Sequence, residues 1–278
     1  MQFTVRSKRL AGAAVAAALT VSLASCASTS STESDVPTDG SLGTINVGAL
    51  AVPAGELLTW LDENAAADAG LDIEWTEFTD FNTPNTALAE GSIDANLFQN
   101  ETFLKNYNEA SGTDLVSVGE VYLPVAAFYS DKVTSIDELE DGAKIAIPDD
   151  PTNEGRALEM LAAEGLIETT EHPTVVADIT DNPHDFEFVE AENASLPGVL
   201  PDVDAAFVTI SFALPAGLKL DDAILVEGQG SKYFNVLATT SELEDDPRVQ
   251  KLYELLLSDE TQAYMEETYG DQMIPVAK

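Results

Sequence analysis

The sequence has few of the residues that most metal and nucleophilic sites require. It contains one cysteine, Cys26, two histidines, and only 12 lysines and arginines against 50 acidic residues, for a formal net charge of −38. A lone cysteine excludes a disulfide framework within the chain, and two separated histidines do not form a pair at metal-ligand spacing. The shortage of basic residues also excludes nucleic acid as a partner, because phosphate binding needs a basic face.

Motifs for nucleotide or acyl chemistry are also missing. The chain has no GxxxxGK[ST] loop for a nucleoside triphosphate and no GxSxG nucleophile motif. His184 stands alone in the acidic loop "DNPHDF", which is more typical of a solvated side chain than of a general base. We therefore expect that the protein is not an enzyme and holds no cofactor or metal.

The N-terminal segment has the features of an export signal. A basic start precedes an apolar run of 14 residues, Leu10 to Leu23, which is shorter than the roughly 20 that a membrane-spanning helix needs. The run ends in "LASC", and this ending resembles the lipobox of bacterial lipoproteins, although a plain signal peptide is the alternative. We predict a signal peptide over residues 1–25, acylation of Cys26, and a disordered Ser/Thr-rich tether over residues 26–43. The protein would then be lipid-anchored on the extracytoplasmic face of the cell membrane.

The rest of the chain alternates between strand and helix patterns. "TINVGAL" (44–50) and "AKIAIP" (143–148) are typical of buried strands, and "PAGELLTWLDENAAADAG" (53–70) has apolar residues at helical spacing. This alternation continues to the C-terminus and predicts an α/β fold with mostly parallel sheets, long enough for two lobes.

The stretch "DDPTNEGRAL" carries the first candidate binding residues. It follows a predicted strand and begins a predicted helix, where free backbone N–H groups would favour an anion. Asn153 adds amide donors, Gly155 would allow close approach of a ligand, and the guanidinium of Arg156 matches a carboxylate in bidentate fashion. The stretch predicts a pocket for a small carboxylate, with a surface ion pair of Arg156 among so many acids as the alternative.

Several motifs in the same order identify a family. From about Ile45 to Val276 the chain resembles the NlpA/MetQ lipoproteins, which are methionine-binding substrate proteins of ABC importers. The matching stretches are "LAEGSIDANLFQNETFL" (88–104), "FYSDKVTSIDEL" (128–139), "DDPTNEGRAL" (149–158), "DITDNP" (178–183), "LPDVDAAFV" (200–208) and "KYFNVLATT" (232–240).

The resemblance implies a two-lobed, periplasmic-binding-protein-like fold of type II. Two crossover strands, expected at 124–130 and 233–240, would join the lobes, and the ligand would lie in the cleft between them. The expected limits are 44–126 and 237–278 for lobe I and 127–236 for lobe II.

The resemblance also assigns roles to individual residues. Asn153, Arg156 and Asn235 match the positions that hold the amino-acid end of the ligand. Asn100, Phe81 and Ser211 stand where the family usually has His, Tyr and Asn, so the other end of the site departs from the family pattern. The expected ligand-binding residues, which include an apolar wall of phenylalanines, are Phe81, Phe98, Asn100, Phe103, Asn153, Arg156, Ser211 and Asn235.

The function implied is that of a substrate-binding lipoprotein of an ABC importer. It would capture L-methionine and deliver it to a membrane permease whose ATPase subunits bind the ATP. Another small apolar amino acid or a Met-containing dipeptide is an alternative ligand, and a surface interaction lipoprotein without a transport role is an alternative class.

Overall fold

The computed structural model describes residues 41–228 and 230–277. The predicted signal peptide, Cys26 and most of the predicted tether lie outside the described residues. In the part of the chain that is described, no helix is both long and apolar enough to cross a membrane.

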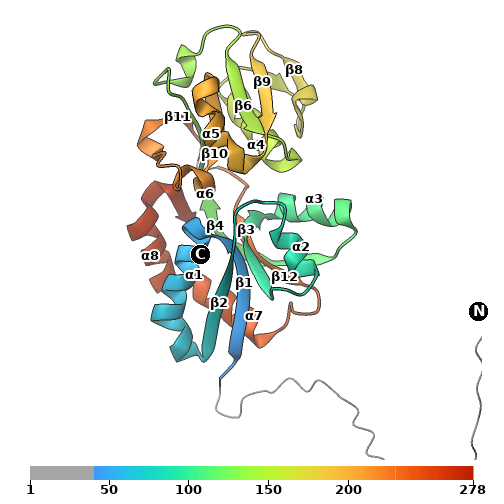
Figure 1. Ribbon diagram of the computed structural model, residues 1–278, viewed down its shortest axis with the longest axis vertical. Coiled ribbons are helices and arrows are strands. Elements are labelled where there is room, and N and C mark those ends of the chain that lie inside the picture. Colours follow the sequence, from blue (N-terminus) through green and yellow to red (C-terminus); the bar gives the residue numbers. More distant parts are fainter. Residues whose placement is uncertain (1–40, 229, 278) are drawn as a thin grey trace, which may run out of the picture. The chain divides into compact units, whose positions relative to one another are not determined.

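Lobe I is built on a mixed sheet with the strand order β13-β4-β12-β3-β1-β2 (Figure 1). Its segments come from both ends of the described chain. They are β1 (Gly43–Leu50), α1 (Glu56–Leu61), β2 (Leu71–Phe78), α2 (Pro84–Ala89), β3 (Ala95–Asn100), α3 (Glu101–Ser111), β4 (Leu115–Pro124), β12 (Asn235–Thr240), α7 (Pro247–Leu256), α8 (Asp259–Tyr269) and β13 (Met273–Pro275).

Lobe II is formed by the middle of the chain around a second sheet with the order β11-β5-β10-β6-β9. A separate two-stranded sheet pairs β7 with β8. The elements are β5 (Ala126–Tyr129), β6 (Lys144–Pro148), α4 (Pro151–Ala163), β7 (Glu168–Thr169), β8 (Ile179–Asp181), β9 (Glu187–Ala191), α5 (Leu196–Val199), β10 (Ala205–Thr209), α6 (Ile210–Ala213) and β11 (Ala223–Val226).

The expectation of mostly parallel sheets is wrong. In lobe I, β1 is parallel to β2 and β3, but β12 is antiparallel to β3 and β4, and β13 is antiparallel to β4. In lobe II, β5 is antiparallel to β10 and β11. In lobe I, β12 is antiparallel to β4 because the chain leaves the lobe along β4 and returns along β12 in the opposite direction.

The chain passes between the sheets at two places. The first passage lies between Pro124, the end of β4, and Ala126, the start of β5. The second lies between Val226, the end of β11, and Asn235, the start of β12. Both passages meet at a backbone hydrogen bond, in which the Glu227 N–H donates to the Ala126 carbonyl at 3.0 Å.

Each sheet is covered on both faces. In lobe I, Leu57 and Leu61 of α1 pack with Leu252 of α7 on one face, and Leu88 of α2 packs with Leu104 of α3 on the other (Figure 1). In lobe II, alternate residues of β10 divide between the faces: Phe207 packs under α4, and Val208 under α5. This alternation is the period-two pattern of a strand buried on both sides.

Helix α4 carries a buried carboxyl group beside its predicted binding residues. Glu154 is 1% exposed, and its side chain accepts a hydrogen bond from the Val176 N–H. Burial is the main cause that raises the pKa of Glu154 to about 7; the hydrogen bond from Val176 opposes this rise, and the neighbouring carboxylates of Glu190 and Asp150 contribute to it. The folded protein therefore holds a proton that the unfolded chain releases at lower pH.

This difference predicts a pH dependence of stability. Between the ordinary pKa of 4.5 and about 7 the folded state binds more protons, so the free energy of unfolding should fall as pH rises through this window. We expect Glu154 to contribute about 1–2 kcal/mol to that fall. Urea unfolding across the window should show a flatter profile for Glu154→Gln, which keeps an acceptor for Val176. An unchanged slope would mean that Glu154 titrates normally.

Gly155 has a packing role that differs from the expected one. A Cβ at this position would lie 2.1 Å from the carbonyl oxygen of Pro173, so the glycine admits the backbone of the following loop against α4. The expectation that Gly155 allows close approach of a ligand is wrong, because the backbone of Pro173 occupies that space.

Gly155→Ala is therefore expected to destabilise lobe II by about 2 kcal/mol, since a rigid carbonyl must move. Gly198→Ala is the matched control, because a Cβ at Gly198 in α5 meets nothing within 4 Å. Chemical denaturation should separate the two variants. Equal stabilities would contradict the proposed contact.

Candidate functional site

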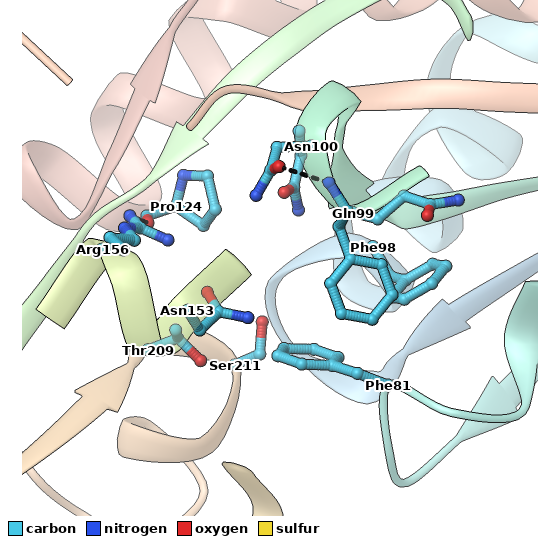
Figure 2. Close-up of a pocket in the computed structure, with 11 residues that line it drawn as sticks. Phe81, Phe98, Gln99, Asn100, Pro124, Asn153, Arg156, Thr209 and Ser211 are labelled. Carbon is cyan, nitrogen blue, oxygen red and sulfur yellow. Dashed lines mark hydrogen bonds between the residues drawn. The ribbon is translucent and has the colours of Figure 1, made fainter. Parts of the chain in front are cut away.

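One pocket brings the predicted residues together where the two lobes meet (Figure 2). The space between its lining atoms amounts to about 330 Å³, part of which is open to solvent. All eight predicted binding residues line it. Among the described residues it is also lined by Gln99, Pro124 and Thr209.

Arg156 lines the pocket but already has a protein partner. Its Nε donates to Glu227 Oε1 at 2.8 Å, and its Nη2 donates to Glu227 Oε2 and to the Pro124 carbonyl, the latter at 2.8 Å. The side chains of Arg156 and Glu227 are 2% and 5% exposed, so the ion pair is buried rather than at the surface. The expected bidentate clamp on a ligand is therefore wrong, because Glu227 occupies the edge of the guanidinium that would form it.

The start of α4 is also capped by the protein itself. Asp150 accepts hydrogen bonds from the Thr152 and Asn153 N–H groups at 3.1 and 2.9 Å. The expectation that these N–H groups are free for an anion is therefore wrong. The same carboxylate accepts from the side-chain amides of Asn153 and Asn193, so Asp150 fixes the orientation of Asn153 at the pocket.

Three further polar side chains face the pocket from both lobes. Asn235 begins β12, and its amide donates to the Tyr122 hydroxyl at 3.4 Å. Burial raises the pKa of Tyr122 well above its usual range, so this partner stays a neutral phenol. Thr209 and Ser211 lie at the end of β10 and in α6. Thr209 is 4% exposed, and its hydroxyl has no hydrogen-bond partner within the described residues.

The opposite side of the pocket is aromatic. The ring centroids of Phe81, Phe98 and Phe103 lie 5.8 to 6.1 Å apart, and Phe212 packs on Phe81 at 4.9 Å. Figure 2 shows Arg156, Asn153 and Thr209 on one side of the pocket and the rings of Phe81 and Phe98 on the other. The pocket therefore has a polar end and an apolar end, as a small amphipathic ligand requires.

Asn100 is the N-cap of α3. Its side-chain oxygen accepts a hydrogen bond from the Phe103 N–H at 3.0 Å, which leaves its amide nitrogen for the pocket. Next to it, Gln99 belongs to a buried amide network with Asn85 and Asn96, with distances of 2.6 to 2.9 Å. This network fixes the end of β3, and therefore the positions of Phe98 and Asn100.

The sequence prediction missed Thr209, Gln99, Pro124 and the partner Glu227. Thr209 had a usable signal, because polar residues at the carboxyl end of a parallel strand commonly face the ligand in α/β folds. Glu227 had none, because it is one of 50 acidic residues in the chain.

Two side-chain hydrogen bonds span the lobes beside the pocket. Asn106 of α3 donates to Thr152 of α4 at 3.0 Å. Asn82 donates to Glu192 at 3.3 Å. Helix α6 of lobe II also contacts the turn at Ala51–Gly55 before α1. These contacts hold the lobes together around the pocket.

His184 lies apart from this site. His184 contacts Asp141 at 2.9 Å and stacks on Phe186, away from the pocket. Over residues 41–228 and 230–277, no group of three or more His, Cys, Asp or Glu side chains is placed to hold a metal ion.

Comparison with known proteins identifies the family of the chain. The NlpA lipoprotein family model matches residues 45–277. D-methionine-binding lipoprotein MetQ of Escherichia coli K12 is 38% identical over 224 residues, which cover 78% of this chain and 82% of that protein.

Solved structures give the same result. A nutrient-binding protein from Burkholderia cenocepacia, solved with bound methionine, is 35% identical with a TM-score of 0.81 and covers 84% of this chain and 100% of its own. A periplasmic substrate-binding protein of an ABC transporter from Coxiella burnetii is 39% identical with a TM-score of 0.80, with the same coverage of both chains. The resemblance in the sequence motifs is thereby confirmed, and the chain belongs to the NlpA lipoprotein family.

Proposed function

We propose that this protein binds one methionine, or a close amino-acid relative, in the pocket between its lobes and delivers it to an ABC permease. The observation that carries the proposal is the division of the pocket into a polar end, with Arg156, Asn153 and Asn235, and an end of phenylalanine rings. A thioether packs favourably against aromatic rings, and the polar end suits the charged groups of an amino acid.

The groups that line the two ends of the pocket support a single amino acid over a dipeptide. The pocket is bounded by Phe81 and Phe103 on one side and by the buried Arg156–Glu227 pair on the other. A second residue would have to displace one of these groups. We therefore place methionine before a Met-containing dipeptide as the ligand.

The relatives' names support the other parts of the proposal. MetQ is named as a binding lipoprotein, and the Coxiella protein as an ABC transporter component. We propose that Cys26 carries the lipid anchor on the extracytoplasmic face of the membrane and that a permease with ATPase subunits receives the ligand. Release of the ligand would follow separation of the lobes, which breaks the contacts of Asn106 and Asn82.

The test is direct identification of the ligand. Purified protein is denatured, released small molecules are identified by mass spectrometry, and candidates are titrated by calorimetry, including both enantiomers of methionine and Met-containing dipeptides. We expect methionine to bind with a dissociation constant far below about 1 mM. If no amino acid or short peptide binds more tightly than that, the transport function is wrong and a surface interaction role takes its place.

A further inference from the structure

The guanidinium of Arg156 keeps only one nitrogen for a ligand. Nε and Nη2 are both bound by Glu227, and Nη2 also donates to the Pro124 carbonyl. For Nη1 there is no hydrogen-bond partner among the residues that the structure describes. Because Arg156 lines the pocket, Nη1 would donate one hydrogen bond to a ligand carboxylate. Neighbouring side-chain amides would donate the remaining hydrogen bonds to that carboxylate.

Glu227 is itself held firmly between the two crossover passages. Its Oε2 accepts from the Ala126 N–H at 3.2 Å, and its Oε1 accepts from the Ser231 hydroxyl at 2.8 Å. The ring of Tyr233 lies 4.9 Å from the guanidinium carbon of Arg156. The negative charge of Glu227 is therefore fixed beside the arginine rather than free to move away from it.

This arrangement sets the net charge of the pocket around a ligand. Among the described residues that line the pocket, Arg156 is the one charged side chain, and Glu227 neutralises it from behind. A net-neutral zwitterion can enter with its carboxylate on Nη1 and its ammonium on amide and hydroxyl oxygens. An anion with the same carboxylate loses its hydration without meeting a net positive charge.

We propose that Glu227 is a positioning residue that determines the charge specificity of the site. By neutralising Arg156 it makes the pocket select zwitterionic amino acids over anions of the same shape. The inference rests on the proposed function, since it assumes that an amino acid occupies this pocket.

The test compares two ligands that differ in the ammonium group. Methionine and 4-(methylthio)butanoate share the carboxylate and the thioether, but the second is an anion at neutral pH. Calorimetric titration should show that wild-type protein prefers methionine. In Glu227→Gln the unpaired charge of Arg156 should favour the anion, so the ratio of the two affinities should shift toward it by about tenfold or more.

If Glu227 had a purely structural role, Glu227→Gln would lower the affinity for both ligands by the same factor. An unchanged affinity ratio in Glu227→Gln would therefore overturn the inference. Glu227→Asp, which keeps the charge, should retain the wild-type preference, and loss of that preference would also contradict it.

Variants of Arg156 keep the inference testable if Glu227→Gln does not fold. Arg156→Gln leaves the negative charge of Glu227 unpaired, whereas the double variant Arg156→Gln/Glu227→Gln lacks both charges. The ratio of methionine affinity to 4-(methylthio)butanoate affinity should therefore be higher in Arg156→Gln than in the double variant. Equal ratios in these two variants would overturn the inference. If wild-type protein binds methionine, the proposed function stands whatever these ratios are, whereas no amino-acid binding by wild type would overturn the function itself.

Discussion

Replacing Arg156 with alanine is expected to weaken methionine binding by about 3 kcal/mol, a hundredfold or more in the dissociation constant. The ligand carboxylate would lose its charged donor at the polar end of the pocket, and Glu227, 5% exposed, would become an unpaired buried charge facing it. Calorimetric titration of both proteins with methionine measures the loss. Arg156→Lys should be intermediate, because it keeps the charge but loses the paired geometry with Glu227.

The control for this experiment is an exposed cation. Lys105 pairs with Glu109 on the surface of α3, with 74% of its side chain exposed, so Lys105→Ala should bind methionine like wild type. Because Arg156→Ala also removes a buried ion pair, its melting temperature is measured in parallel to confirm that the variant is folded. A folded Arg156→Ala protein with nearly wild-type affinity would show that Arg156 does not hold the ligand.

Phe98→Ala is expected to have the second large effect, a loss of about 2 kcal/mol in methionine affinity. Phe98 is 6% exposed and lies within 6 Å of the rings of both Phe81 and Phe103, so its removal opens the apolar end of the pocket. The thioether would lose aromatic contact, and water could enter. The free energy of unfolding should also fall, by about 3 kcal/mol, through the cavity that is created.

Phe128→Ala is the matched control for Phe98→Ala. Phe128 is fully buried in lobe II, packs on Phe207 with centroids 5.6 Å apart, and does not line the pocket. Its loss should lower stability by a similar amount but leave methionine affinity unchanged. If both variants lose affinity equally, the effect of Phe98→Ala reflects general destabilisation and not contact with the ligand.

The pocket depends on both lobes for its chemistry. Lobe I contributes the phenylalanine rings of β3 and α3 together with Asn235, while lobe II contributes Asn153, Arg156, Thr209 and Ser211. Neither half would hold both ends of an amino acid alone. A ligand that contacts both sides therefore stabilises the arrangement in which Asn106 and Thr152 are hydrogen-bonded, which couples binding to the contact between the lobes.

Much of this arrangement followed from local signals in the sequence. The buried strand β6 was evident from the stretch at 143–148, and the helix α4 was expected to begin within "DDPTNEGRAL". The order of the motifs identified the family and the two-lobed fold. These features are readable because they depend on neighbouring residues.

Tertiary structure alone decided which contacts the predicted binding residues make. Arg156 pairs with Glu227, 71 residues further along the chain, and local pattern does not distinguish that glutamate from the other acids. The cap that closes the start of α4 and the close contact of Gly155 with Pro173 likewise depend on which segments fold against each other. The same is true of the Thr209 hydroxyl, which has no hydrogen-bond partner in the described part of the chain. The sequence by itself determined the family, the α/β class and eight of the residues that line the pocket. The contacts of those residues, and therefore the charge that a ligand meets, were decided by packing between distant segments, because hydrogen-bond geometry exists only once both partners have been brought together.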